Sequence, residues 1–177
     1  MPDGSASSGS NFFLIGFMGS GKTHWGKIWA LKNNLSFVDL DDLIEKKEGI
    51  TISGIFEAKG EDYFRKAEAG ALRDCAAFRN TIIASGGGTP CFFDNMKWMN
   101  DHGTTIYLEG TPKEIIQRLS TEQEKRPLVK ELNNTALQLF IEQKIMERKP
   151  FYTQAHITVQ SAMVTKESFA RMLSGCK

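Results

Sequence analysis

Short, nearly continuous apolar runs alternate along the chain with longer stretches that show helical periodicity. The runs are rich in Phe, Ile, Val and Thr, which is typical of strands covered on both faces. The longer stretches place apolar residues on one helix face, as Trp25, Ile28 and Trp29 do. The predicted strands are residues 11–16, 35–39, 81–85, 104–108 and 156–159, and the predicted helices are residues 22–33, 61–78, 134–148 and 165–174.

Strands that alternate with helices predict a parallel sheet with crossover helices, a three-layer α/β domain. A chain of 177 residues without an internal repeat or linker fits one compact domain. We assign this domain to residues 11–177. The preceding Gly/Ser-rich residues 1–10 are expected to be a disordered tail, and the least apolar interior stretch, residues 120–130, is expected to be a mobile surface loop.

Composition excludes several classes of function. The formal net charge of +1 gives no broad basic surface for nucleic acid. Residues 1–10 lack the basic start and apolar run of a signal peptide, and no apolar run approaches the roughly 20 residues needed to span a bilayer. The widely spaced Cys75, Cys91 and Cys176 form no CxxC pair and indicate neither a zinc site nor a disulfide framework. We therefore expect a cytoplasmic protein with no membrane partner, and a monomer.

Residues 16–23, GFMGSGKT, match the P-loop pattern G-x-x-x-x-G-K-[ST] at every fixed position. Glycines let backbone N–H groups surround phosphate oxygens, and the following helix adds its positive N-terminal end. Lys22 is expected to reach the β- and γ-phosphates of ATP, and Thr23 to bind Mg²⁺. A Gly-rich turn with an exposed lysine is the alternative, but the position between a strand and an amphipathic helix favours the P-loop. The predicted ATP-binding residues here are Gly19, Ser20, Gly21, Lys22, Thr23 and His24.

Asp39 ends an apolar run, as the acidic residue of a Walker B motif does. It is the second predicted Mg²⁺ residue, acting directly or through water, with ATP as co-substrate. The alternative is an Asp that ends a strand and caps the next helix. The other candidate run, residues 81–84, ends in Ser85 instead.

The second substrate is expected at the carboxyl ends of the parallel strands. Asp41 there can accept a hydrogen bond from a substrate hydroxyl and take its proton, or it can be a first-turn acid that stabilises the helix dipole. Ser85 is followed by Gly86, Gly87 and Gly88, which offer close backbone approach to a ligand or form a flexible turn.

Three arginines are candidates for binding anions. Arg65 stands three residues before Glu68, a spacing that can orient a guanidinium. Arg148 lies in phase with an apolar helical stripe. It can hold a substrate carboxylate or complement the C-terminal end of the helix. Arg126 lies in the charged loop and can reach over the transferring phosphate, or it can be an ordinary surface arginine.

Together these motifs resemble the shikimate kinase family over about residues 11–174. The resemblance is carried by the P-loop, the D-x-D motif from Asp39 to Asp41, Ile55-Phe56, Gly60-Glu61, the F-R-x-x-E motif from Phe64 to Glu68, Ser85 with the three glycines, Arg126-Pro127-Leu128, and the R-x-P-x-Y match from Arg148 to Tyr152.

The resemblance implies the nucleoside-monophosphate-kinase-like P-loop fold with a five-stranded parallel sheet, a shikimate-binding segment over about residues 40–68 and a lid over about residues 119–133. It implies shikimate and ATP as ligands, in the chorismate pathway of aromatic amino acid biosynthesis. Asp41 would be the catalytic base, assisted by Lys22 and Arg126, and Arg118 would pack on adenine. The implied substrate-binding residues are Asp41, Phe56, Phe64, Arg65, Gly86, Gly87, Gly88 and Arg148.

The chain departs from the family pattern at His24, where a small hydroxyl residue is commoner, at the bulky Trp25 and at residues 88–91. Phosphorylation of the 3-hydroxyl of shikimate is the function that the joint motif set favours. The alternatives are a gluconate kinase or nucleotide-type kinase on the same fold, or an ATP-binding module without catalysis. The intact Lys22, Thr23, Asp39 and Asp41 argue against the last.

Overall fold

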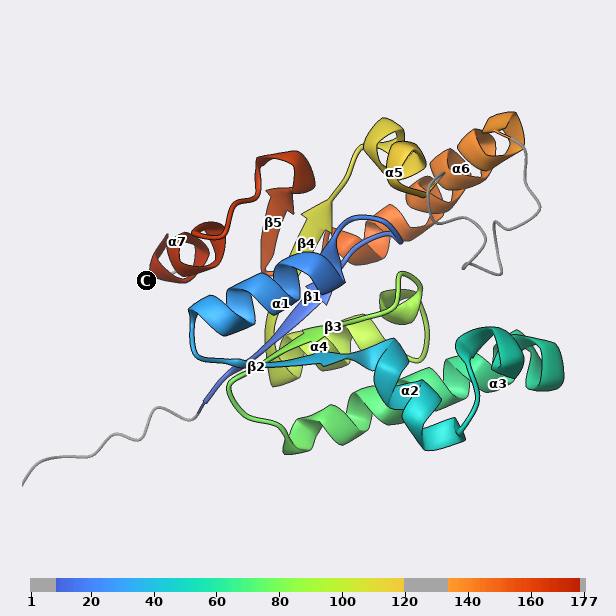
Figure 1. The fold of residues 1–177 in the computed structure, drawn as a ribbon, viewed down its shortest axis with the longest axis horizontal. Helices are drawn as coiled ribbons and strands as arrows, with labels where there is room; N and C mark the ends of the chain where they lie inside the picture. Colours follow the sequence, from blue (N-terminus) through green and yellow to red (C-terminus); the bar gives the residue numbers. More distant parts are fainter. Residues whose placement is uncertain (1–8, 120–133, 176–177) are drawn as a thin grey trace, which may run out of the picture.

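The computed structural model describes residues 9–119 and 134–175. Five strands form one parallel sheet in the order β2-β3-β1-β4-β5 (Figure 1). This confirms the predicted five-stranded parallel sheet. The strands are β1 (Asn11–Ile15), β2 (Ser36–Asp39), β3 (Thr81–Ala84), β4 (Gly103–Glu109) and β5 (Ile157–Gln160).

Strand β1 lies at the centre of the sheet. Phe13 is in register with Ile83 of β3 on one side and with Thr105 of β4 on the other. All five residues of β1 are buried, as its continuous apolar run predicts. The strands that follow β1 in the chain lie on both sides of it, so the strand order reverses at β1. Open α/β sheets bind ligands at such a switch point, beyond the carboxyl ends of the strands. The P-loop follows β1 directly and therefore lies at this point.

The helices connect the strands and cover the sheet. In chain order they are α1 (Lys22–Lys32), α2 (Leu40–Glu48), α3 (Ile52–Asp74), α4 (Asn95–His102), α5 (Pro112–Leu119), α6 (Asn134–Tyr152) and α7 (Ser168–Gly175). Single 3-10 turns occupy Cys75–Ala77, Thr89–Cys91 and Ser161–Met163.

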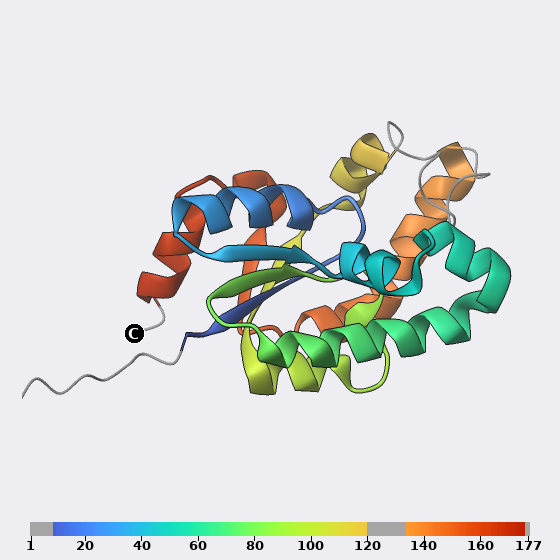
Figure 2. The same cartoon turned by 60° about the horizontal axis from the view of Figure 1, so that its bottom comes forward.

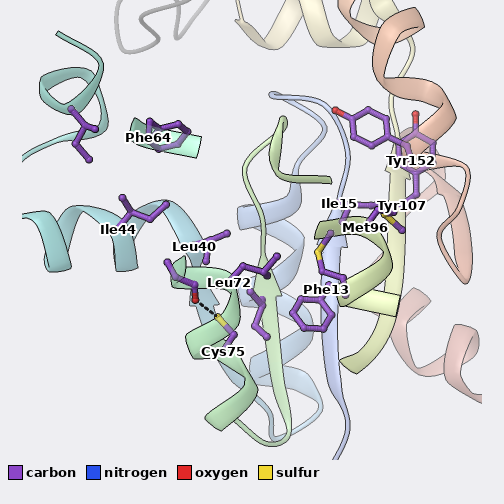
Figure 3. Close-up of a cluster of buried hydrophobic side chains, with 14 residues drawn as sticks. Phe13, Ile15, Leu40, Ile44, Phe64, Leu72, Cys75, Met96, Tyr107 and Tyr152 are labelled. Atoms are coloured by element: carbon purple, nitrogen blue, oxygen red, sulfur yellow. Dashed lines mark hydrogen bonds between the residues drawn. The ribbon is translucent and has the colours of Figure 1, made fainter. Parts of the chain in front are cut away.

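Each face of the sheet has its own hydrophobic core, because successive side chains of a strand point to opposite faces. Phe12 belongs to a cluster with Trp29 of α1 and Phe169 of α7. Phe13 belongs to a cluster with Leu72 of α3, shown in Figure 3. Figure 2 shows α1 and α7 on one side of the sheet and α3 and α4 on the other. The predicted three-layer α/β/α architecture is confirmed.

Some helix predictions were wrong in extent. Helices α2, α4 and α5, of eight or nine residues each, were not among the predicted ranges. Helix α3 begins at Ile52 rather than at residue 61, and its backbone breaks at Gly60, where φ is 79°. Helix α6 runs on to Tyr152 rather than ending at residue 148.

Other sequence predictions lie outside the described residues. Residues 1–8 of the predicted tail are outside the described part of the chain. The whole of the loop predicted over residues 120–130, which includes Arg126, is outside it as well. Cys176 is also outside. Across residues 9–119 and 134–175, no helix combines the length and the apolar character that crossing a membrane requires.

Candidate active site

The P-loop winds around the ammonium group of Lys22. This Nζ donates hydrogen bonds to the carbonyl oxygens of Gly16, at 2.8 Å, and Phe17, at 2.9 Å. Gly21 precedes α1 with a left-handed φ of 96°, a conformation that glycine adopts without a steric cost. No described side chain caps the first turn of α1, and that turn holds no acidic residue. The N-terminal N–H groups of α1 therefore remain suited to an anion.

Thr23, which follows Lys22, joins the P-loop to the end of β2. Its hydroxyl donates a hydrogen bond to Oδ2 of Asp39 at 2.7 Å. The other carboxylate oxygen of Asp39 accepts from the backbone N–H of Asp41 at 3.1 Å and caps α2. One carboxylate oxygen of Asp39 thus caps a helix, as the alternative interpretation stated, while the other is bound to the P-loop threonine; the Mg²⁺ role stays a prediction.

The donor set at this point fits Mg²⁺. A hydroxyl and a carboxylate oxygen are hard oxygen ligands, and Mg²⁺ commonly takes only one or two protein oxygens, completing its shell with waters and substrate phosphates. The described part of the chain contains no group of three or more His, Cys, Asp or Glu side chains placed to hold a metal.

Two cavities meet at the carboxyl edge of the sheet. One, of about 430 Å³, lies toward α2 and α3, and we call it the acceptor cavity. The other, of about 660 Å³, lies over the P-loop, and we call it the nucleotide cavity. The residues that line both are Met18, Asp41, Gly86 and Gly87. Among the described residues that line both cavities, Asp41 is the one carboxylate, so it borders the place where ligands of the two cavities would meet.

Arg65 lies in the wall of the acceptor cavity, on α3, with its side chain only 7% exposed. Its Nη1 donates to Oε2 of Glu68 at 3.0 Å, and its Nε and Nη2 donate to Oε1 of Glu61 at 3.1 and 2.9 Å. The other oxygen of Glu68 accepts from the Thr89 hydroxyl at 2.5 Å. Two carboxylates therefore fix the guanidinium plane, as the Arg65–Glu68 spacing predicts.

Glu68 is fully buried in this network. Burial raises the pKa of its carboxyl above the usual value, and the neighbouring Arg65 charge and the Thr89 hydrogen bond oppose that rise. The carboxylate thus orients Arg65 at a cost in desolvation.

Gly86, Gly87 and Gly88, which follow β3, each pack closely against a different part of the site. A Cβ on Gly86 would lie 2.7 Å from Oε1 of Glu68, and one on Gly88 would lie 2.7 Å from Nη1 of Arg65. A Cβ on Gly87 would lie 3.1 Å from the backbone nitrogen of Met18. The structure thus gives these glycines a packing role that the sequence analysis missed, in addition to the predicted backbone approach to a ligand.

Arg148, on α6, also lines the acceptor cavity. Its guanidinium carbon lies 5.3 Å from the centre of the Phe17 ring. One turn later, the hydroxyl of the buried Tyr152 donates to the carbonyl oxygen of Gly87 at 2.5 Å, and its ring stacks on Tyr107 with centroids 5.0 Å apart (Figure 3). Burial raises the pKa of the Tyr152 phenol, which keeps the donor protonated. This contact fixes the end of α6 against the glycine segment.

Most predicted site residues converge on the two cavities. Phe56 and Phe64 line the acceptor cavity with ring centroids 4.8 Å apart. His24 and Arg118 line the nucleotide cavity, where Nη1 of Arg118 donates to the Gly19 carbonyl at 2.9 Å. Of the predicted P-loop residues, Ser20 is fully buried and does not line the nucleotide cavity.

The sequence analysis did not name several cavity residues as site residues. In the acceptor cavity these are Met18, Asp42, Glu45, Thr51, Ile52, Ser53 and Glu68, and in the nucleotide cavity they are Met18, Trp25, Ser161, Ala162 and Val164. Met18 and Glu68 lie within the P-loop and F-R-x-x-E motifs, and the others match no motif and are brought together only by the fold.

Comparisons with known proteins agree with this arrangement. A family model described as shikimate kinase matches residues 18–177. A shikimate kinase of Parabacteroides distasonis is 43% identical over 156 residues, which cover 88% of this chain and 90% of that protein. A solved shikimate kinase structure from Bacteroides thetaiotaomicron has a TM-score of 0.87 and 37% identity, covering 94% of this chain and 97% of that one. The shikimate kinase of Acinetobacter baumannii, solved in complex with shikimate, has a TM-score of 0.84 and 29% identity, covering 94% of this chain and 92% of that one.

Proposed function

Because the chain belongs to the shikimate kinase family and phosphorylates shikimate with ATP, we propose that Asp41 lies between the two substrates as the catalytic base. The observation that carries this proposal is the shared lining of the two cavities, in which Asp41 is the one carboxylate. A carboxylate in hydrogen-bond reach of both the acceptor hydroxyl and the transfer point suits general base catalysis.

In the proposed reaction, the 3-hydroxyl oxygen of shikimate attacks the γ-phosphorus of ATP. The new bond joins that oxygen to phosphorus, the bond between the γ-phosphorus and the β,γ-bridging oxygen breaks, and the hydroxyl proton passes to Asp41. ADP leaves with the bridging oxygen. Such transfers depend mainly on positioning and charge neutralisation, which the oriented groups of both cavities supply.

Arg65 and Arg148 would hold the shikimate carboxylate. They line the acceptor cavity from different helices, α3 and α6. A guanidinium pairs well with a carboxylate through parallel N–H donors. Phe56 and Phe64 would form the apolar wall beside the ring, and the backbone of residues 86–88 would approach the substrate closely, since glycines carry no side chain of their own.

On the nucleotide side, Lys22 and the N–H groups of the P-loop would bind the β- and γ-phosphates, with His24 and Arg118 toward the rest of ATP. Thr23 and Asp39 would hold Mg²⁺. When bound, this ion neutralises phosphate charge during transfer. Arg126 and the lid over residues 119–133 lie outside the described residues except Leu119, so their roles stay predictions from the sequence.

A gluconate or nucleotide-type kinase was the alternative on the same fold, and nothing in the comparisons favours it. The assignment is tested by ADP release from the purified protein with shikimate, gluconate or nucleoside monophosphates as the acceptor. We expect turnover with shikimate and only background with the others. Turnover with gluconate alone would overturn it.

We also propose that the protein works as a monomer, because Lys22, Asp41, Arg65 and Arg148 all come from one chain. Light scattering coupled to size-exclusion chromatography tests this. The cytoplasm is the proposed location, which agrees with the free thiols of Cys75 and Cys91.

A further inference from the structure

Phe92 packs on the guanidinium of Arg65 from outside the acceptor cavity. The centre of its ring lies 4.5 Å from Cζ of Arg65. This is within the range of about 6 Å in which an aromatic face attracts a cation. The Phe64 ring centre also lies near this carbon, at 5.1 Å. With Glu61 and Glu68 in the guanidinium plane, carboxylates and aromatic rings both restrain Arg65.

The backbone around Phe92 is held in place by its neighbours. Cys91 N–H donates to the Gly88 carbonyl at 2.9 Å, and Asn95 N–H donates to the Phe92 carbonyl at 2.9 Å. Asn95 is fully buried, and its side chain donates to the carbonyl of Thr89 at 2.9 Å. The ring of Phe92 is therefore presented by a braced segment rather than by a free loop.

The segment from Thr89 to Phe92 contacts Arg65 in two ways, through Glu68 and directly. Thr89 binds one oxygen of Glu68, and Glu68 binds Arg65 with its other oxygen. Arg65 then contacts Phe92, which lies three residues after Thr89. The same short segment thus fixes the guanidinium both through a carboxylate and through an aromatic face.

Phe92 does not line the acceptor cavity. It lines a separate cavity of about 280 Å³ with Glu61, Cys91, Phe151 and neighbouring residues, and Arg148 borders both. Phe92 is 36% exposed, so it is not simply a core residue. An effect of Phe92 on the acceptor must therefore pass through other residues, and the contact of its ring with the charged Arg65 offers such a path.

We propose that Phe92 is a positioning residue for the acceptor carboxylate, which it serves by holding the guanidinium of Arg65 against its aromatic face. This inference rests on the proposed role of Arg65. It deepens that role, because it makes the affinity for shikimate depend on a side chain that shikimate does not touch.

Replacing Phe92 with leucine keeps apolar bulk and removes the aromatic face. The cation–π contact restrains Arg65 with and without shikimate, so only the part of it that positions the guanidinium for the carboxylate affects affinity, on the order of a factor of five. We expect Phe92→Leu to raise KM and Kd for shikimate about fivefold, with kcat and KM for ATP nearly unchanged, and Phe92→Tyr to restore the wild-type values. A merely structural role would move both KM values and kcat together.

Phe93 supplies the matched control. It is the adjacent phenylalanine and is 52% exposed, and no aromatic contact joins it to Arg65 among the described residues. Phe93→Leu should leave KM for shikimate within twofold of wild type. A second series substitutes fluorinated phenylalanines at position 92, which weaken the negative ring face at nearly constant shape, and KM for shikimate should rise with each fluorine.

The outcomes distinguish the proposed role of Arg65 from the proposed role of Phe92. If Arg65→Lys leaves the shikimate Kd unchanged, the proposed role of Arg65 is wrong. If Arg65→Lys weakens shikimate binding but Phe92→Leu and the fluorinated series do not, the role of Arg65 stands and the inference about Phe92 is overturned. Equal losses in Phe92→Leu and Phe93→Leu would also overturn it.

Discussion

The hydroxyl of Thr23 donates a 2.7 Å hydrogen bond to the carboxylate of Asp39, which ties the P-loop to the end of a strand two positions away in the sheet. The same carboxylate caps α2 through the backbone N–H of Asp41. A single side chain therefore links the phosphate-binding loop to the helix that carries the proposed base.

This link predicts how Mg²⁺ dependence changes in Asp39→Asn. Asparagine is also a good N-cap, so α2 should form normally, but the negative charge toward the cation is lost. We expect the Mg²⁺ concentration for half-maximal rate to rise about tenfold or more. Asp42→Asn removes a charge from the same helical turn and is the control. Equal Mg²⁺ dependence in wild type and Asp39→Asn would show that Asp39 is only a helix cap.

Gly88→Ala should selectively weaken shikimate binding. The added Cβ would lie 2.7 Å from Nη1 of Arg65, so the guanidinium must shift. We expect the shikimate Kd to rise at least tenfold while the ATP Kd stays near wild type, as isothermal titration would show.

The matched control is Gly70→Ala in α3, where the added Cβ meets nothing within 4 Å. Alanine in a helix is favoured over glycine by roughly 0.5–1 kcal/mol, so this variant should be slightly more stable and bind shikimate normally. Normal shikimate binding by Gly88→Ala would contradict the packing role.

Tyr152→Phe removes the hydrogen bond to the Gly87 carbonyl and keeps the ring stacked on Tyr107. A lost hydrogen bond that leaves a partner unsatisfied costs about 1–3 kcal/mol. Urea unfolding should show that loss, together with a raised KM for shikimate, because Arg148 lies one turn away on the same helix. A stability loss without any change in KM would mean that this contact supports the fold alone.

Glu68→Gln should change how stability depends on pH. Burial raises the pKa of Glu68 above its ordinary value of 4.5, so the folded state holds this proton more tightly than the unfolded chain does. The stability that the protonated Glu68 carboxyl contributes to the folded state is fully present below pH 4.5. It is lost as the pH rises through the pKa of Glu68 in the folded protein.

Wild type should therefore lose free energy of unfolding relative to Glu68→Gln as pH rises above about 4.5. Urea titrations of both proteins at several pH values measure this difference. A difference that stays constant, or that changes in favour of wild type as pH rises, would show that the Arg65 charge outweighs burial.

The fold was largely predictable from the apolar pattern. Each predicted strand overlaps an observed one, because strands buried on both faces, such as β1, need continuous apolar residues. The pattern missed α4, whose buried apolar residues are only Met96 and Met99. It also placed the start of α3 after Gly60, because helical phase breaks there.

The site was predictable where chemistry requires a residue type in a motif, as at Lys22, Asp41 and Arg65. It was not predictable where a side chain acts through another. Phe92 follows the glycine motif but has no pattern of its own, and its contact with Arg65 joins residues 27 positions apart through the packing of α3. Such contacts depend on three-dimensional neighbours rather than on spacing in the chain.

Turnover by Asp41→Asn, measured with the affinities for both substrates, tests the central claim most directly. Asparagine keeps the size of the side chain but cannot take a proton. We predict that kcat falls by about 10²–10⁴-fold, while ATP binds as in wild type and shikimate binds within about tenfold of it, as expected when one neutral hydrogen bond replaces a charge-assisted one. A purified, folded Asp41→Asn protein that turns over at nearly the wild-type rate would contradict the account.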